Sequence, residues 1–492
     1  MSAVIASPGD VVELTLEVPP GKVISYDLAA LCSALNINDS TRVAVETDGL
    51  RRAMVTIYPS NPLAQVRAVT REDLVMDRHG RIVTGVYHNG RPAKKRLFDP
   101  STGSAQRFLL FGTTGAGKSK SLQLELIAEK LNGIVSWVAD LKFGQSVPEA
   151  EGNVDWFVRT PEGAILMLMA AVAIAQERMR RYSAAGRTSF LLTPGGDPLF
   201  HVRIEEANRL LERGAPYRDL ATYLIRELGR TGRSVGVGIG LSAQASHLEE
   251  MGGSDTLRAM LKEGEVTLLR WSSKMMQQLV ADGLLPAGEQ LMNIGKSLKP
   301  RALRSQFDPD DDDEDAPGTQ GMAYLLSGPR PTALMRHLRV GSIAPLPGLD
   351  PEILALYGDD EPRRLEEVSH KAAGDAYALR DDPAAFERLC EAFRDEQTQQ
   401  VRVTAGGHAS SRSPAGPGPD DAPRPKKVLL DDRVRAVLAD AEVPMTAEDV
   451  LAAVNDDGGK PVSLGSVRTA LGGLVKGAAA TRVEHGLYAS AR

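Results

Sequence analysis

The feature that most constrains the fold is a glycine-rich turn in FLLFGTTGAGKSKSLQLELI, which begins at Phe108. The turn fits the pattern G-x-x-x-x-G-K-[ST], and it follows a predicted strand and precedes a predicted helix, as a phosphate-binding loop requires. Glycines let backbone N–H groups turn inward around phosphates, and the start of the helix adds a favourable dipole. The loop consists of Gly112, Thr113, Thr114, Gly115, Ala116, Gly117, Lys118 and Ser119.

This loop predicts ATP and Mg²⁺ as ligands. Lys118 would reach the β and γ phosphates, and the Ser119 hydroxyl would ligate Mg²⁺. The alternative is a glycine-rich turn between a strand and a helix that binds nothing. Because every position of the pattern is matched in the required context, the sequence favours the nucleotide site.

A second predicted strand ends in two acidic residues, in LFHVRIEEANRLL at residues 199–211. ATPases with a phosphate loop place one acid here for the Mg²⁺ shell and a second to orient the attacking water. We assign Glu205 to the metal and Glu206 to the water, although the metal position is usually Asp. His201 and Arg203 also interrupt a strand that would ordinarily be apolar throughout. The alternative is a helix N-terminus whose acids favour its dipole.

A third strand pattern, RTGRSVGVGIGLSAQ at residues 230–244, is spaced by glycines and ends in a polar residue. By its position, Gln244 would sense the γ-phosphate at the carboxyl edge of the sheet, where ligands of open α/β sheets lie. The alternative is an amide at a strand end that bonds a loop.

The chain divides into five predicted segments. Residues 1–100 mix short strand patterns with one helical stretch and predict a small α+β lead-in domain. Residues 101–345 alternate apolar strands with amphipathic helices, which predicts a parallel sheet covered on both faces. Residues 346–400 predict a helical extension, residues 401–427 a flexible linker rich in Pro, Gly and Ser, and residues 428–492 a compact end domain. An acidic run at residues 308–315 predicts a solvated loop.

Composition limits the partners and the location. The formal net charge is −6, so nucleic acid would have to be met by a local basic patch. Cys32 and Cys390 lie far apart and outside any Cys/His cluster, which argues against a disulfide framework or a zinc site. The most apolar run, residues 164–175, is shorter than the roughly 20 residues that span a bilayer, and predicts a buried helix. We therefore expect a cytoplasmic protein without a transmembrane segment, which could act at the inner face of the cell membrane through a partner protein.

Five segments, in this order, resemble the FtsK/SpoIIIE family of DNA-translocating ATPases, over roughly residues 20–341. FGTTGAGKSKSLQ is similar to the family's first motif, and VADLKFGQ to its Asp-Pro-Lys segment, with Leu141 in place of proline. ERMRRYSAAGRTSF resembles its Glu-Met-x-x-Arg-Tyr helix and the loop that follows. GRSVGVGIGLSAQ resembles its Gly-Arg strand that ends in Gln, and TLLRWSSKMM its later strand with a Ser-Ser-Lys turn.

The resemblance implies a RecA-like α/β core that assembles as a homo-hexameric ring and threads double-stranded DNA. It also implies that Arg233 reaches a neighbouring subunit's nucleotide as an arginine finger, because a planar cation stabilises transition-state charge. A surface ion pair is the alternative, and Arg230 is the other candidate for the finger. Contacts to DNA phosphates in the pore would come from Arg187 and Lys274, for which a solvated role is an equal alternative.

The end domain has helix patterns at residues 432–441, 446–454 and 463–478, followed by two short strand patterns. This order predicts a winged helix-turn-helix whose third helix would enter the major groove. Acidic residues balance the basic ones, so docking of a protein is the alternative. The family's tethered winged helix favours DNA, and six weak modules around one duplex would gain effective concentration. The predicted contacts to phosphates or base edges are Ser466, Arg468, Thr469, Lys476 and Arg482.

We therefore expect ATP-driven translocation of double-stranded DNA, with sequence recognition by the end domain. Conjugative plasmid transfer of the TraB-like kind and chromosome segregation both fit this activity. Abundant Ala, Gly, Arg and Asp indicate a high-GC genome, which slightly favours plasmid transfer. Two other functions stay open at this point. One is a type VII secretion-like ATPase that moves protein, and the other is a nucleotide-binding, DNA-binding regulator without motor activity.

Overall fold

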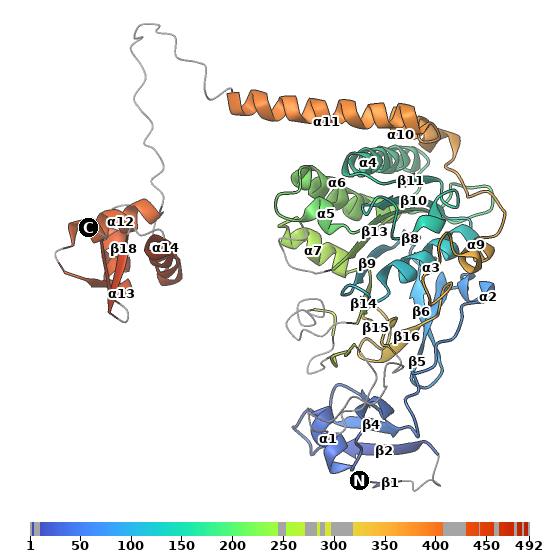
Figure 1. Ribbon diagram of the computed structural model, residues 1–492, viewed down its shortest axis with the longest axis horizontal. Helices are drawn as coiled ribbons and strands as arrows, with labels where there is room; N and C mark the ends of the chain where they lie inside the picture. Colours follow the sequence, from blue (N-terminus) through green and yellow to red (C-terminus); the bar gives the residue numbers. More distant parts are fainter. Residues whose placement is uncertain are drawn as a thin grey trace. The chain divides into compact units, whose positions relative to one another are not determined.

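A computed structural model describes residues 2–3, 10–244, 252–270, 283–285, 291–296, 318–406, 430–441, 443–456, 462–476, 480–484 and 487–490. It consists of two compact units, Met1–Ala405 and Gly406–Arg492, which are described separately here (Figure 1). Three sequence predictions fall outside the described residues: the DNA contact Lys274, the acidic run at residues 308–315, and residues 407–427 of the linker.

The centre of the first unit is a ten-stranded sheet with the order β11-β10-β12-β13-β9-β14-β15-β16-β5-β6. Its first six strands are parallel: β11 (Trp156–Val158), β10 (Val135–Asp140), β12 (Phe200–Glu205), β13 (Val237–Ala243), β9 (Arg107–Phe111) and β14 (Glu265–Leu269). Four antiparallel strands follow: β15 (Met322–Leu325), β16 (Leu334–His337), β5 (Arg81–Tyr87) and β6 (Pro92–Arg96). This mixed sheet, rich in parallel pairs, fits the RecA-like core that the sequence predicts.

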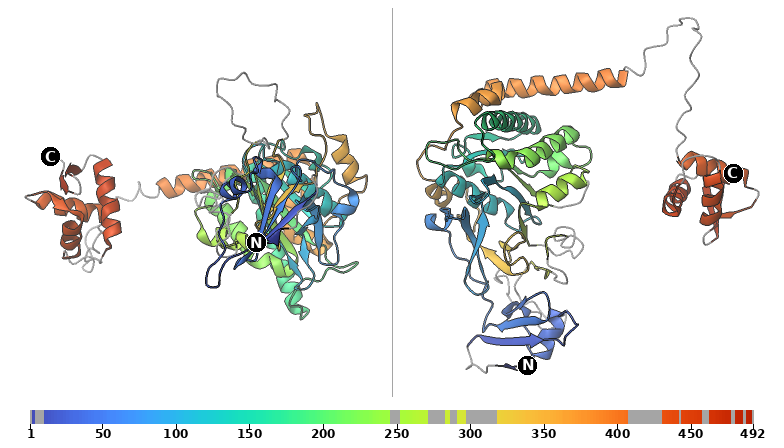
Figure 2. Two further views of the ribbon diagram at one scale, coloured as in Figure 1. Left: turned by 90° about the horizontal axis from the view of Figure 1, so that it is seen from below. Right: turned by 180° about the vertical axis from the view of Figure 1, so that it is seen from behind.

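Helices cover both faces of the sheet (Figures 1 and 2). The helix after the phosphate loop, α3 (Lys118–Leu131), packs on one face together with α2 (Arg71–Leu74) and α9 (Pro351–Tyr357). The other face carries α4 (Pro161–Ala184), α5 (Asn208–Leu211), α6 (Arg218–Thr231) and α7 (Asp255–Lys262). This division follows from right-handed crossovers between parallel strands. The connection through α3 leads from β9 to β10 in one direction along the sheet, whereas the connections through α4, α6 and α7 run in the opposite direction.

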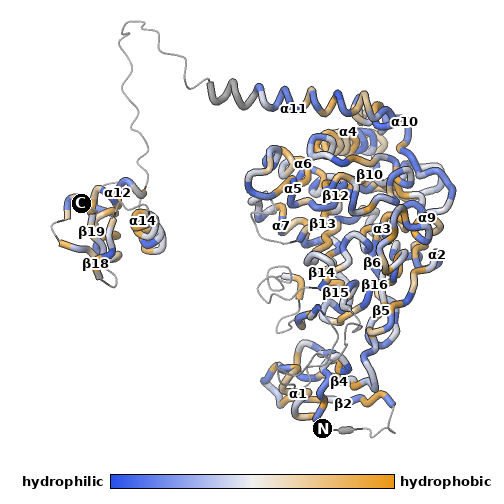
Figure 3. Tube along the Cα trace, in the orientation of Figure 1, coloured by the Kyte–Doolittle hydropathy of each residue, from blue (hydrophilic) through white to orange (hydrophobic). Residues whose placement is uncertain are grey.

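The apolar run at residues 164–175 lies within α4 and is mostly buried, as the sequence predicts. Its hydrophobic residues appear as orange stretches of the tube in Figure 3. Among the described residues, none of the helices combines the length and the apolar character that a membrane crossing requires.

The N-terminal residues form a separate four-stranded antiparallel sheet, β1 (Ser2–Ala3), β2 (Val12–Glu17), β4 (Arg52–Ile57) and β3 (Val43–Thr47), with α1 (Leu28–Ala34) and the short helix η1 (Ser40–Arg42) beside it. Sequence analysis placed residues 81–96 in the same lead-in domain, whereas in the structure they form β5 and β6 of the large sheet. A hairpin pattern around Asn89-Gly90 specifies the pairing of its own two strands but not the sheet that they join. A small hairpin of β7 (Phe98–Asp99) and β8 (Ser104–Ala105) then leads into β9.

The segment after the large sheet packs back onto the helices. Helix α9 contacts α3, and α10 (Glu367–Ala378), which is kinked at Gly374, packs along α4. Helix α11 (Pro383–Gly406) follows and is largely hydrophilic in Figure 3. It continues to Gly406, into the segment that the sequence predicts to be a linker.

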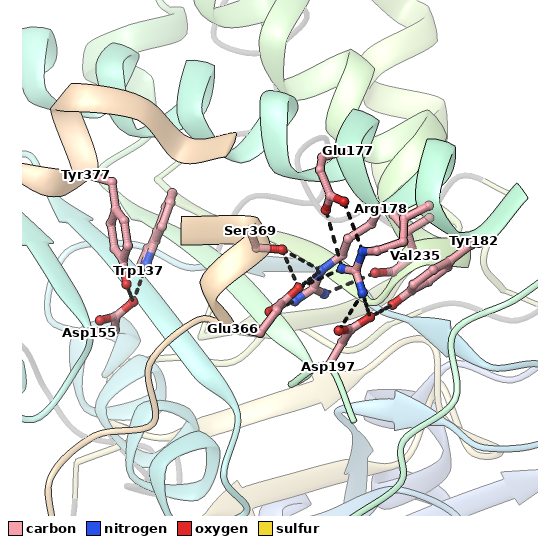
Figure 4. A network of polar contacts seen from close by, with 11 residues as sticks. Trp137, Asp155, Glu177, Arg178, Tyr182, Asp197, Val235, Glu366, Ser369 and Tyr377 are labelled. Atoms are coloured by element: carbon pink, nitrogen blue, oxygen red, sulfur yellow. Dashed lines mark hydrogen bonds and ion pairs between the residues drawn. The ribbon is translucent and has the colours of Figure 1, made fainter. Parts of the chain in front are cut away.

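A buried polar network anchors α10 (Figure 4). Arg178 of α4 is fully buried and donates through Nε and Nη2 to the two carboxylate oxygens of Glu366, at 3.1 and 2.8 Å. Arg178 also donates to Ser369 at 3.2 Å. Further along, the Tyr377 hydroxyl donates to Asp155 at 2.7 Å, beside the edge strand β11. The extension is therefore part of the folded core of this unit.

The second unit contains α12 (Leu430–Asp440), α13 (Ala447–Asp456) and α14 (Leu464–Lys476), and a sheet of β17 (Met445–Thr446), β19 (Leu487–Ser490) and β18 (Ala480–Glu484). Its core consists of apolar residues of the three helices, including Val434, Leu438, Val450, Val454, Val467, Leu471 and Leu474. Three helices followed by a hairpin is the order of elements that the sequence predicts.

A buried ionic network holds α3 against the sheet. Glu129 of α3 lies 2.8 Å from His201 Nδ1 and accepts from Arg203 Nε at 2.8 Å. Glu125, one turn earlier, lies 3.2 Å from Arg203 Nη1 and 2.5 Å from Lys95 Nζ of β6. All five side chains are buried. The polar residues that interrupt β12 in the sequence are therefore the partners of the acidic face of α3.

The glycines of β13 make room for this network. A Cβ atom on Gly238 would lie 2.6 Å from His201 Cδ2, and one on Gly240 would lie 2.6 Å from Arg203 Nη1. Both distances are too short for real contacts, so only glycine fits opposite these two side chains. The glycine spacing of VGVGIG is thus a packing requirement of the neighbouring strand.

The charge of Glu129 depends on its partners. Burial acts to raise the pKa of Glu129, but Arg203, His201 and Ser136 together outweigh burial and lower it from 4.5 to about 2. Because this pKa is lower in the folded chain than in the unfolded chain, the contribution to stability is complete above about pH 4.5. It is lost as the pH falls towards about 2.

We expect Glu129→Ala to destabilise the first unit by about 3–5 kcal/mol, because it leaves Arg203 buried without this carboxylate. The variant should also lack part of the acid sensitivity that the wild type shows below about pH 4.5. Urea unfolding at several pH values measures both effects. Glu367→Ala is the control, because Glu367 pairs with Lys371 on the exposed surface of α10. Equal shifts of the urea midpoint in the two variants would contradict the structural importance of the network.

Candidate nucleotide site

The phosphate loop lies at the carboxyl end of β9, between β13 and β14. Gly115 and Gly117 have φ angles of 71° and 102°, which favour glycine and allow the loop to curl. The Gly321 N–H donates to the Ala116 carbonyl at 2.9 Å, which ties the loop to the antiparallel flank of the sheet. Lys118 Nζ is buried and donates to the Gly112 carbonyl at 3.0 Å, so the lysine closes the loop from inside. Burial lowers the pKa of Lys118, while Glu205 and Glu206 act in the opposite direction.

Ser119 and Glu205, the two residues assigned to Mg²⁺, lie together. The Ser119 hydroxyl donates to Glu205 Oε1 at 3.0 Å. Glu205 is fully buried, burial raises the pKa of its carboxyl, and its Oε2 has no hydrogen-bond partner in the described part of the chain. A hydroxyl and a carboxylate are hard oxygen donors of the kind that Mg²⁺ prefers. The donors therefore fit this ion, and the longer side chain of Glu reaches Ser119 where an Asp is usual.

Glu206 and Gln244 also come together. Glu206 follows β12 with a φ of 54°, a conformation that is uncommon outside glycine and that clusters at functional sites. Gln244, just after β13, points its Nε2 at the two carboxylate oxygens of Glu206, at 3.3 and 3.2 Å. The amide thus contacts a predicted site residue and not only the loop around it.

Lys142 is a site residue that sequence reasoning did not select. Its Nζ lies 2.5 Å from Glu206 Oε1. Burial acts to raise the pKa of Glu206, but Lys142 and Gln244 outweigh burial and lower it, so this carboxyl is ionised at neutral pH.

The position of Lys142 follows from Asp140 at the end of β10. Asp140 accepts hydrogen bonds from the backbone N–H groups of Lys142, Ser146 and Val147, at 3.0, 2.7 and 3.1 Å, and so folds the chain back. Asp140 is also in register with Glu205 of the neighbouring strand β12. The sequence contained a signal for this position in VADLKFGQ. Lys142 comes two residues after the end of β10, and the neighbouring strand β12 ends in acids.

Arg233 and Arg187 lie at the opposite edge of the sheet. Arg233 belongs to the short helix η3 (Gly232–Val235), which precedes β13, whereas Gln244 follows that strand. Seven residues of β13 separate the two edges by about 20 Å. Arg187 lies in the loop before β12, with its guanidinium 4.0 Å from the centre of the Tyr182 ring. Neither arginine reaches the phosphate loop of its own chain.

The predicted DNA contacts of the second unit lie on α14 and β18. Ser466, Arg468 and Thr469 are exposed on α14, and Arg468 Nη2 lies 2.8 Å from Glu448 Oε1 of α13. Arg482 of β18 is also exposed and lies 5.9 Å from the centre of the Tyr488 ring. Lys476 is the last residue of α14, and its side chain lies outside the described atoms.

Comparisons with known proteins give matches among solved structures only. The sequence matches no family model and no curated protein sequence. Among solved structures, a pCW3 conjugation coupling protein TcpA with ATPγS matches 69% of this chain and 88% of its own, with 16% identity and a TM-score of 0.43. The type VII secretion ATPase EccC of Thermomonospora curvata matches 71% of this chain, with 18% identity and a TM-score of 0.42. EssC of Geobacillus thermodenitrificans matches 68%, with 13% identity and a TM-score of 0.40.

The chain spans only 36% of the EccC chain and 52% of the EssC chain that it matches. At such low identities and TM-scores these matches carry no functional conclusion. What the chain itself offers is the geometry at the carboxyl edge of its sheet, where a phosphate loop, two acids, an amide and a lysine meet.

We expect Glu205→Gln to weaken the Mg²⁺-dependent part of ATP binding by about tenfold or more, because the substitution removes the charge and keeps the size of the side chain. Binding without Mg²⁺ should change little. Titration of a fluorescent ATP analogue with and without Mg²⁺ measures both quantities, with Glu367→Gln as a distant control. A Glu205→Gln variant that gains as much affinity from Mg²⁺ as the wild type would contradict the assignment.

Proposed function

We propose that this protein is an ATPase whose hydrolysis moves double-stranded DNA through a homo-hexameric ring. The observation that carries the proposal is the convergence of Lys118, Ser119, Glu205, Glu206 and Gln244 at one edge of a parallel sheet. These are the side-chain types that phosphate binding, metal binding and water activation require. The five ordered segments of the sequence support DNA as the substrate.

In this proposal each residue has one role. Lys118 leaves the Gly112 carbonyl and binds the β and γ phosphates, while the backbone of the loop surrounds them. Ser119 and Glu205 would hold Mg²⁺, which would supply charge neutralisation at the phosphates. Glu206 orients the attacking water, and the ion pair with Lys142 keeps its carboxyl ionised for that role. Gln244, hydrogen-bonded to Glu206, connects the γ-phosphate to the end of β13.

A ring of identical subunits gives Arg233 a role that its own chain does not. Because Arg233 lies at the amino edge of the sheet, its side chain is far from the phosphate loop of its own chain, and in the proposed ring it would serve the nucleotide of another copy. An arginine supplied across a subunit boundary stabilises transition-state charge and links hydrolysis to assembly. This position supports the proposed hexamer.

Contacts to DNA are proposed for both units. Arg187 and Lys274 would contact phosphates in the pore. The second unit would act as a winged helix, with α14 in the major groove and Arg482 in the wing. We propose conjugative plasmid transfer or chromosome segregation as the setting, at the inner face of the cell membrane through a partner protein.

Steady-state ATP hydrolysis with and without long double-stranded DNA tests the motor. We expect DNA to stimulate the wild type several-fold, and Lys118→Ala to lower the stimulated rate by at least about a hundredfold, because it removes the cation at the phosphates. Lys120→Ala is the matched control, since Lys120 lies two residues along the same helix and pairs with Asp350 at 3.4 Å. Hydrolysis that DNA leaves unchanged, at concentrations where a hexamer forms, would overturn the proposal. Stimulation by a protein instead would favour a secretion ATPase.

The winged helix has its own test. We expect Arg468→Glu to weaken DNA binding by the intact chain and to reduce the slope of log affinity against log salt by about one, as loss of a phosphate contact does. Fluorescence anisotropy at several salt concentrations gives the slope. Arg435→Glu, on α12, is the control. An unchanged slope for Arg468→Glu would favour a protein-docking role for this unit.

A further inference from the structure

Arg270, directly after β14, lies against the middle of the phosphate loop. Its side chain is buried, with 8% of the residue exposed. Nη2 donates to the Thr114 carbonyl at 3.1 Å, and a Cβ atom on Gly115 would lie 3.4 Å from the same nitrogen. Sequence analysis quoted this residue within TLLRWSSKMM but selected Lys274 in that segment.

The backbone of Arg270 braces the loop without help from its side chain. The Arg270 carbonyl accepts from Thr113 N at 3.4 Å and from Thr113 Oγ1 at 3.2 Å. The Arg270 N–H donates to the Met322 carbonyl at 2.9 Å, which continues the pairing of β14 and β15. These bonds survive any substitution of the side chain, so a guanidinium is not needed to hold the loop in place.

Among the described residues, Arg270 lacks the carboxylate partner that the buried arginines Arg178 and Arg203 have. Arg178 pairs with Glu366, and Arg203 pairs with Glu125 and Glu129. No carboxylate in the described ranges lies within ion-pair distance of Arg270, and the Thr114 carbonyl is the one partner found there for its five N–H groups.

Arg336 offers a useful comparison, because it is also buried and also lacks a carboxylate among the described residues. It donates to three backbone carbonyls, those of Leu63, Ala64 and Gly318, at 2.7, 3.4 and 2.8 Å. Carbonyl oxygens therefore bind both Nη atoms of that guanidinium, while its Nε has no partner in the described part of the chain. Within the described ranges Arg270 has one such bond, to the Thr114 carbonyl of the loop.

A buried cation without an anion costs free energy, and the loop beside it is built to hold an anion. The planar fork of a guanidinium matches two phosphate oxygens at once. We propose that Arg270 binds the terminal phosphates of the nucleotide held by its own chain, so that the site selects nucleoside triphosphates. This inference rests on the proposed nucleotide site and adds a second cation to it, beside Lys118.

Binding of a non-hydrolysable ATP analogue, ADP and AMP to the intact chain tests the inference. We expect Arg270→Met to weaken binding of the ATP analogue by about tenfold or more, binding of ADP by less, and binding of AMP by less than about twofold. The reason is that the lost hydrogen bonds are to the terminal phosphates, which ADP has in part and AMP lacks. Arg270→Lys should recover part of the affinity for the ATP analogue, since it restores the charge but not the fork. Glu367→Gln, at an exposed ion pair with Lys371 on α10, should leave all three affinities unchanged.

Thermal unfolding without nucleotide separates binding from bracing. We expect Arg270→Met not to lower the Tm, because an apolar side chain replaces a buried charge. A lower Tm together with equal losses for all three nucleotides would show a structural brace and overturn the inference. Unchanged affinities in Arg270→Met would overturn it as well. Failure of the wild type to bind the ATP analogue at all would instead contradict the proposed nucleotide site.

Discussion

The ionic contact between α3 and β12 determines where the nucleotide site can form. Helix α3 begins at Lys118 of the phosphate loop, and β12 ends at Glu205. Glu129 and Arg203 join the two elements further from the site, where both side chains are buried. Because this contact fixes the position of the helix along the strand, Ser119 and Glu205 meet at 3.0 Å at the other end. Charge pairing in the core thus sets the geometry of the two proposed metal ligands at the carboxyl edge of the sheet.

The same physical rule, that buried charges are paired, explains the site itself. Glu206 is paired with Lys142 and bonded by Gln244, which holds its strained backbone position without a ligand. Lys118 has the Gly112 carbonyl as a substitute for phosphate. Among the described residues Arg270 bonds through its side chain to one carbonyl of the loop. The site therefore keeps Glu206 compensated, and in the proposed function Lys118 and Arg270 would meet the charge of a triphosphate.

Local patterns in the sequence predicted the phosphate loop, the two acids and the parallel core, because strand, turn and helix there follow one another in the chain. Features that depend on distant partners could not be predicted in this way. His201 and Arg203 looked like faults in a strand until α3 supplied their acids, and Gly238 and Gly240 resembled a motif although they only clear space for those side chains. Residues 81–96 were placed in the lead-in domain, whereas they join the large sheet, since a hairpin does not encode the sheet that it joins.

Strand β13 connects Arg233 and Gln244, two residues with roles in the proposed mechanism. It begins after Arg233 and ends before Gln244, and its glycines pack closely on the buried side chains of β12. In the proposed ring, this close packing would let β13 link Gln244, at the γ-phosphate of one site, to Arg233 at the amino edge. The length of β13, about 20 Å, keeps Arg233 from the nucleotide site of its own chain, so its proposed role lies at the site of a neighbouring copy.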